Sequence, residues 1–293
     1  MDQKIIDLYD GYIHGQMSRR DFIDRAAALV GSAAVAAGLL PLLSSDYARA
    51  ETIPATDPRL ASERISYDTP RGKVSAYLSR PKAKGKRPAV IVIHQDKGLN
   101  PHIEDVARRL AAEGFLALAP DLLAPYGGTP ANEEEALNLF RTKLDREDLA
   151  IPLATIALLK THPESTGKVG AAGFCFGGGV VDRMALNSPD LDAAVAYYGT
   201  PPADYKTKVN DIKAPLLLHY AALDTRVGAT IPDWEAALKA SNKKYQLYMY
   251  EGANHAFNDD TAGPRYNKAA ADLAWSRTLP FFKEHLGAPP NGA

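Results

Sequence analysis

Apolar residues fall into short runs that alternate with longer segments of helical periodicity. Continuous runs such as 89–93 and 115–119 are typical of parallel strands buried on both faces. Two alternating segments around Thr69-Pro-Arg-Gly72 predict a β-hairpin ahead of them. Such a series of β-α units predicts an α/β fold, a mostly parallel sheet of about seven or eight strands with helices on both faces. The predicted strands are 63–67, 73–79, 89–93, 115–119, 169–172, 193–198, 215–219 and 245–250.

The first fifty residues follow a different pattern. Ser18-Arg-Arg-Asp-Phe-Ile23 is a twin-arginine motif, and an uncharged, alanine-rich stretch follows at 26–43. Ala48-Arg49-Ala50 then places small residues where a signal peptidase reads, so cleavage is expected before Glu51. We interpret residues 1–50 as a twin-arginine signal with an N-terminal extension, although 1–16 have no assigned role. The alternatives are a membrane anchor and a first helix of the fold.

Export by this route predicts a periplasmic or secreted bacterial protein whose partner during export is the twin-arginine translocase. The stretch 26–43 is weakly hydrophobic for a transmembrane span, so no stable membrane anchor is expected after cleavage. The mature chain, 51–293, is expected to form a single domain. The oligomeric state is not accessible from the sequence.

Composition and charge narrow the possible functions. The chain has 293 residues, of which 46% are hydrophobic and 24% charged, with a formal net charge of −1. These values are typical of a globular protein with one large core. No basic cluster stands out, so nucleic-acid binding is not expected. The single cysteine, Cys175, excludes an internal disulfide.

A sharp turn connects the predicted strand 169–172 to a helix. The turn reads Gly173-Phe-Cys-Phe-Gly177, with Cys175 at its corner. In a nucleophile elbow the corner residue adopts strained backbone, and side chains two residues before or after it would clash, which explains the glycines. Cys175 is therefore the candidate nucleophile. The alternative is a small buried hydrophobe in a flexible turn.

An acid and a base follow at the same edge of the predicted sheet. Asp224 comes after the strand 215–219, and His255 comes after the strand 245–250. The order nucleophile, acid, base is that of α/β-hydrolases. His255 would accept the thiol proton and return it to the leaving group, while Asp224 would orient the imidazole. Taken alone, Asp224 could be a helix cap and His255 an ordinary loop histidine.

Four short motifs stand out along the chain: Gly173-Phe-Cys-Phe-Gly-Gly178, Leu99-Asn-Pro-His102, Ala117-Leu-Ala-Pro-Asp-Leu122 and Asn254-His-Ala-Phe257. In this combination the chain resembles the dienelactone hydrolase (carboxymethylenebutenolidase) family over residues 60 to 286. The resemblance implies a single-domain α/β-hydrolase with a Cys175, His255 and Asp224 triad. It also implies an oxyanion hole formed by the backbone N–H groups of Phe176 and Asp96.

Two positions depart from the family pattern. The glutamate that contacts the resting thiol in the family is Gln95 here, which cannot take a proton at neutral pH. We expect Gln95 to contact the thiol and His255 alone to activate it. The arginine that holds a substrate carboxylate is replaced by Asp259. Arg265 could reach into the pocket, as could Arg141 or Arg226, and Tyr126 could line it.

The sequence therefore predicts hydrolysis of an ester or lactone through an acyl-Cys175 intermediate, without metal or cofactor. One alternative is a non-catalytic binding protein for small molecules on a hydrolase scaffold. Another is a thiol-based redox sensor, and a third is a carboxylesterase or peptidase without a preference for lactones. The physiological substrate does not follow from the sequence.

Overall fold

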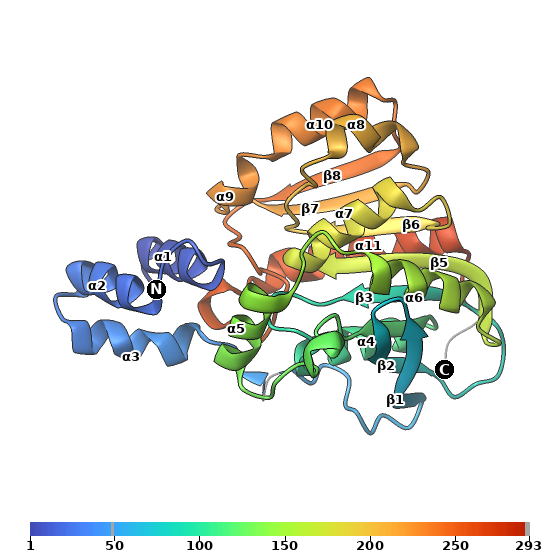
Figure 1. Ribbon diagram of the computed structural model, residues 1–293, viewed down its shortest axis with the longest axis horizontal. Coiled ribbons are helices and arrows are strands. Elements are labelled where there is room, and N and C mark those ends of the chain that lie inside the picture. The colour runs from blue at the N-terminus through green and yellow to red at the C-terminus, as the bar shows by residue number, and fades with distance from the viewer. Residues whose placement is uncertain (48–49, 291–293) are drawn as a thin grey trace.

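A central sheet organises the molecule, as the hydrophobic pattern predicts (Figure 1). The computed structural model describes residues 1–47 and 50–290, and these residues form an eight-stranded sheet of order β1-β2-β4-β3-β5-β6-β7-β8. β1 and β2 are antiparallel to each other, β2 is antiparallel to β4, and the other pairs are parallel. The strands are β1 Leu60–Thr69, β2 Gly72–Pro81, β3 Arg87–Ile93, β4 Leu116–Pro120, β5 Ser165–Phe174, β6 Ala193–Tyr197, β7 Leu216–Ala221 and β8 Tyr245–Tyr250.

Helices cover both faces of the sheet. On one face, α4 (Pro101–Ala112) and α11 (Lys268–Leu286) pack against alternate residues of the central strands. On the other face lie α6 (Ala150–Thr161), α7 (Phe176–Asn187) and α10 (Ile231–Ala240). The whole of β3 is buried, because both of its faces are covered; this explains why it reads as a continuous apolar run. The remaining helices among residues 50–290 are α5 Glu133–Lys143, α8 Tyr205–Lys208, α9 Thr225–Gly228, η2 Ala124–Tyr126, η3 Val209–Asp211 and η4 Gly263–Arg265.

The N-terminal residues form three helices beside the sheet, drawn in blue in Figure 1. They are α1 (Gln3–Ile13), α2 (Arg19–Val30) and α3 (Ala33–Leu43). The twin-arginine motif begins α2, where Ser18 and Asp21 form a reciprocal capping box. The three helices share a small core of their own, composed of Ile5, Tyr9, Ile13, Phe22, Ala26, Ala36, Leu40 and Leu43. In the uncleaved chain these helices, which we call the N-terminal segment (residues 1–47), are thus folded.

The predicted uncharged stretch 26–43 does not form one helix. Gly31, with φ 82°, ends α2, and α3 follows after a bend of 112°. Within the described ranges no single helix is long and apolar enough to cross a membrane, whereas α2 and α3 pass that test of length and composition only as a bent pair. Ala48 and Arg49 of the predicted cleavage site lie outside the described residues.

Candidate active site

Cys175 sits at the corner between β5 and α7. Its φ of 54° and ψ of −116° are strained for a residue with a side chain. A Cβ at Gly173 would lie 2.0 Å from the carbonyl oxygen of Gly177, and one at Gly177 would lie 2.3 Å from the carbonyl oxygen of Ile93. Only glycine fits at these two positions. The corner also places the sulfur at the N-terminus of α7, where the helix dipole favours a thiolate.

His255 and Asp224 meet in the loops after β8 and β7. His255 Nδ1 donates to Asp224 Oδ2 at 2.5 Å, and both side chains are buried. The other carboxylate oxygen of Asp224 accepts the Val227 N–H at 3.0 Å, which fixes the carboxylate at the start of α9. His255 Nε2 is buried without a hydrogen-bond partner among the described residues. A ring nitrogen of His255 lies within 4.8 Å of Cys175 Sγ, so the three predicted residues come together.

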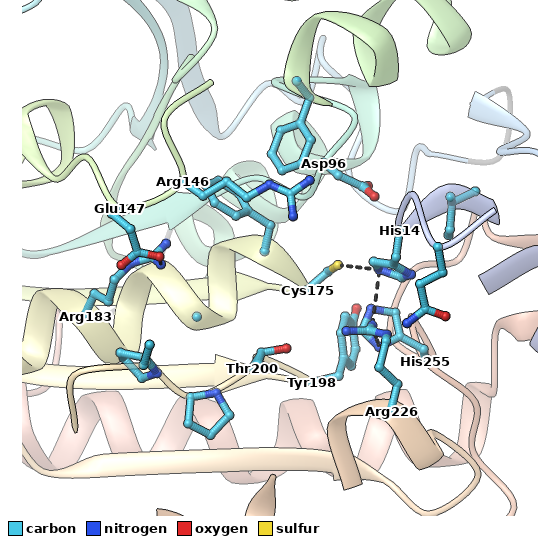
Figure 2. Close-up of a pocket in the computed structure, with 18 residues that line it drawn as sticks. His14, Asp96, Arg146, Glu147, Cys175, Arg183, Tyr198, Thr200, Arg226 and His255 are labelled. Carbon is cyan, nitrogen blue, oxygen red and sulfur yellow. Dashed lines mark hydrogen bonds and ion pairs between the residues drawn. The ribbon is translucent and has the colours of Figure 1, made fainter. Parts of the chain in front are cut away.

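A second histidine contacts the sulfur from the N-terminal segment (Figure 2). His14, directly after α1, has its Nε2 3.2 Å from Cys175 Sγ. Its Nδ1 is 2.8 Å from the carbonyl oxygen of Asp10 and 3.2 Å from Asp10 Oδ1. The rings of His14 and His255 meet edge to face, with centroids 4.8 Å apart. Sequence reasoning missed His14 because it assigned residues 1–50 to a signal; the spacing of Asp10 and His14, one helical turn apart, was the available sign.

The charges around the sulfur favour a thiolate. Burial raises the pKa of the Cys175 thiol, but His255 and His14 outweigh it and lower the pKa to about 6. Burial lowers the pKa of His255, whereas the Cys175 thiolate and Asp224 raise it to about 9. His14 behaves in the same way: burial lowers its pKa, and Cys175 with Asp10 raises it well above the usual range. Between about pH 6 and about pH 9 the site therefore holds a thiolate flanked by imidazolium groups.

A cavity of about 410 Å³ opens beside the sulfur. Its walls come from the body of the protein, by which we mean residues 50–290, and from the N-terminal segment. The N-terminal segment contributes Ile13, His14 and Gln16. Phe176 and Asp96, the predicted oxyanion-hole residues, both line it. The Phe176 N–H is one of the first helical N–H groups of α7, which lack intrahelical partners. Asp96 follows β3, on the edge of the sheet that carries Cys175.

Three other predicted pocket residues lie elsewhere. Gln95 does not contact the thiol; its side-chain amide donates to Asp259 Oδ2 at 3.3 Å. Tyr126, in η2, lines separate hollows beside α5 and α6 and is not among the residues that line the cavity at the sulfur. Arg265 is buried outside the cavity, with its guanidinium 5.0 Å from the ring centroid of Tyr9. Arg265 therefore supports α1 and does not face the cavity.

Arg146, Arg183 and Arg226 all line the cavity, and Arg183 already pairs with Glu147 at 2.8 Å. Arg141 donates to the carbonyl oxygens of Tyr12 and Ile13, and Arg226 lies 3.4 Å from Asp10 Oδ2. Arg146, in the loop before α6, lines the cavity and packs on the Phe140 ring at 5.0 Å. Among the described residues no carboxylate forms an ion pair with Arg146. Sequence reasoning did not select Arg146, because its loop matches no motif.

The site also contains potential metal ligands. His14, Cys175 and His255 bring their donor atoms within 4.8 Å of one another, and a thiolate with two imidazoles is a donor set that Zn²⁺ accepts. His102, Asp259 and Asp260 form a second such group, but Arg109 already pairs with Asp260 there. The expectation that the protein uses no metal remains a prediction.

The strand order, the strained elbow at Cys175 and the buried His255–Asp224 pair define the class of protein as an α/β-hydrolase. A family model described as the dienelactone hydrolase family matches residues 74–286, and a second, described as YqhI-like, matches residues 1–31. The chain belongs to the dienelactone hydrolase family, and it is a hydrolase of the carboxylic ester class.

Similar proteins agree with this assignment. A Yersinia pestis protein, whose naming as a carboxymethylenebutenolidase is itself an inference, is 34% identical over 73% of this chain and 84% of its own length. An Escherichia coli K12 protein named in the same way is 32% identical over 81% of this chain and 93% of its own length. A crystal structure from Klebsiella pneumoniae, named by inference as a dienelactone hydrolase, has a TM-score of 0.69 at 30% identity. The superposition of the two structures covers 77% of this chain and 99% of the Klebsiella chain.

Proposed function

We propose that the protein hydrolyses an ester or lactone through an acyl-cysteine intermediate at Cys175. The observation that carries this proposal is the arrangement at the elbow: a strained, buried sulfur with the buried His255–Asp224 pair within reach. A cysteine with a lowered pKa and a neighbouring imidazolium is an activated nucleophile.

The chemistry proceeds in two steps. The thiolate attacks the carbonyl carbon, and the negative charge on the carbonyl oxygen is held by the N–H groups of Phe176 and Asp96. His255 gives its proton to the leaving alkoxide as the carbon–oxygen bond breaks. His255 then takes a proton from water, which attacks the thioester, and the electron pair of the carbon–sulfur bond returns to sulfur. Asp224 keeps Nδ1 of the imidazole protonated throughout.

Arg146 indicates the substrate class. Its guanidinium faces the cavity (Figure 2) and has no carboxylate partner among the described residues. A substrate that carries a carboxylate beside the ester would pair with it. The Arg146→Met variant is expected to raise KM about tenfold for a carboxylated ester and to leave KM for p-nitrophenyl acetate unchanged. Equal effects on the two substrates would contradict this role.

Export belongs to the same proposal. The twin-arginine motif and the apolar residues 26–43 support translocation into the periplasm or the medium, with cleavage before Glu51. Fractionation of the producing cells, followed by N-terminal sequencing of the recovered enzyme, tests this. Enzyme retained in the cytoplasm would contradict export, and exported enzyme that keeps its first residues would contradict the cleavage.

The catalytic proposal is tested with the full chain. Hydrolysis of p-nitrophenyl acetate and of a dienelactone is measured for wild type, Cys175→Ala and His255→Ala, with His162→Gln as a control for histidine loss away from the cavity. The first two variants are expected to lose about 10³-fold or more in kcat/KM, and the control is expected to keep its activity. Undiminished turnover by folded Cys175→Ala would overturn the acyl-cysteine mechanism.

A further inference from the structure

His14 contacts the reactive sulfur directly, although it lies 161 residues away in the sequence. Its imidazole is held from the opposite side by Asp10, through both the backbone carbonyl oxygen and the carboxylate. The side chains of His14 and Asp10 are only 13% and 16% exposed. The thiol therefore has two histidine–aspartate pairs beside it, one from the body and one from the N-terminal segment.

The N-terminal segment is attached around this contact by polar groups of the body. Arg141 Nη2 donates to the carbonyl oxygens of Tyr12 and Ile13, at 2.6 and 2.7 Å. These are C-terminal carbonyls of α1, which lack intrahelical partners and attract a cation. Arg226 pairs with Asp10 at 3.4 Å from the other side. Cations on both sides thus fix the end of α1 that carries His14.

Further contacts fix the rest of the segment. Lys97 Nζ donates to Ser45 Oγ at 2.7 Å, and the Asp46 N–H donates to the carbonyl oxygen of Thr261 at 2.9 Å. The Gln3 side-chain amide donates to Asn254, the neighbour of His255. The YqhI-like match over residues 1–31 contains both Asp10 and His14, so these residues lie in a segment that resembles a defined sequence family.

The position that the family resemblance assigns to a thiol-contacting glutamate is not used here. The Gln95 side chain donates to Asp259 and makes no hydrogen bond to the sulfur, whereas His14 Nε2 lies at hydrogen-bond distance from the sulfur. We propose that α1 is part of the active site and that His14, held by Asp10, is a second imidazole partner of the Cys175 thiolate. This inference rests on the proposed nucleophilic role of Cys175, and it concerns the chain that retains its first residues.

The two imidazoles have different tasks. His255 Nε2 has no hydrogen-bond partner in the part of the chain that the structure describes, so it is available to move a proton to and from the reacting oxygen atoms. His14 Nε2–H donates to sulfur and retains its proton. Arg226 Nη2 lies 3.3 Å from the same nitrogen and adds a permanent positive charge beside the thiolate. When water attacks the thioester, the carbon–sulfur bond breaks and its electron pair returns to sulfur, where the His14 hydrogen bond stabilises it. His14 thereby makes the thiolate both an accessible resting state and a better leaving group.

Cleavage before Glu51 would remove this partner. An exported enzyme that lacked residues 1–50 would keep the His255–Asp224 pair and lose the His14–Asp10 pair. The two proposals therefore make different statements about the same fifty residues, and N-terminal sequencing of the enzyme recovered from the cells separates them.

The test uses the full chain with His14→Gln, which keeps the approximate length of the side chain but cannot carry a positive charge. The rate of thiol alkylation by iodoacetamide is measured against pH, together with the pH profile of kcat/KM and the deacylation rate after the p-nitrophenyl acetate burst. His162→Gln is the matched control, because that histidine lies in the loop between α6 and β5.

His14→Gln is expected to move the alkylation midpoint upward from about 6 by about one pH unit and to slow deacylation about tenfold. An unchanged midpoint together with unchanged deacylation would overturn the proposal. A rise in kcat/KM would overturn it as well, because it would show that the segment blocks the site. Alkylation requires no ester turnover, so it tests the thiol contact separately from catalysis. If His14→Gln shifted the alkylation midpoint but Cys175→Ala still hydrolysed esters, the acyl-cysteine mechanism would be wrong and the contact between His14 and the thiol would stand.

Discussion

The body of the protein and the N-terminal segment each bring a histidine–aspartate pair to one sulfur, but they hold it differently. The His255–Asp224 pair comes from loops at the ends of β8 and β7, two strands of the central sheet, of which β7 is buried throughout. The His14–Asp10 pair comes from helices with a separate small core, attached mainly through polar contacts. The second pair is therefore the more easily displaced.

This difference in support suits the different tasks of the two pairs, proton transfer for His255 and charge stabilisation for His14. Loops at the carboxyl ends of strands in a packed sheet fix a proton-transfer group within a fraction of an ångström, which acid–base catalysis requires. A stabilising charge tolerates a looser support, since Coulombic attraction falls slowly with distance. We therefore expect large losses of activity from damage to the first pair and moderate losses from damage to the second.

The largest effect is expected from Asp224→Asn. The amide would favour the wrong imidazole tautomer and would no longer stabilise the imidazolium, so kcat should fall about 10³- to 10⁴-fold. The melting temperature, recorded beside kcat, controls for loss of the Val227 N–H contact. A loss of less than about tenfold would mean that His255 does not depend on Asp224.

Phe22→Ala should affect the N-terminal segment selectively. Phe22 is fully buried in the small core, and its truncation costs about 3–5 kcal/mol. Hydrogen exchange in residues 3–43 should accelerate while the sheet stays protected, and kcat/KM should fall to the level of His14→Gln. If exchange accelerated equally in both regions, the segment would be no separate unit.

Asp10→Asn should weaken the second pair without removing the imidazole. Without the carboxylate the pKa of His14 falls, so His14 loses its charge at lower pH and stabilises the thiolate less. The thiolate is lost as pH falls through the thiol pKa, so the acidic limb of kcat/KM should move upward from about 6. We expect about a tenfold loss at pH 6. The alkaline limb, set by His255 near 9, should move little.

The smallest effect is expected from Arg141→Met. The variant removes two hydrogen bonds to the end of α1 but leaves Arg226 and the thiol contact in place. Docking of the segment should weaken, and kcat/KM should fall about threefold. Limited proteolysis around residues 14–18 should become faster. Unchanged proteolysis would show that Arg141 does not hold the segment.

The sequence predicted the body better than the segment, for a physical reason. β3 and β5 appear as apolar runs, and the elbow appears as two glycines around Cys175, because burial and close backbone approach restrict the residues allowed there. For His14 the sequence shows only its spacing from Asp10, one helical turn away. A histidine on a polar helix end is compatible with solvent, and only the tertiary fold brings it to Cys175.

The departures at Gln95 and Asp259 illustrate the same limit. Their positions relative to the family motif were clear from the sequence, but their contact with each other was not. Arg146 was overlooked because the direction of a loop side chain depends on packing against Phe140. Local patterns determine which elements form, whereas side-chain contacts between distant loops follow from the assembled structure.

The distance in sequence between His14 and Cys175 has a consequence for biosynthesis. The N-terminal segment leaves the ribosome first, and its short-range helical contacts can form early. Its partner residues in the body, Arg141, Cys175 and Arg226, are synthesised much later, and the central sheet must close before they share a surface. The segment that is made first therefore docks last, and a nascent chain carries no complete thiol site until translation is almost finished.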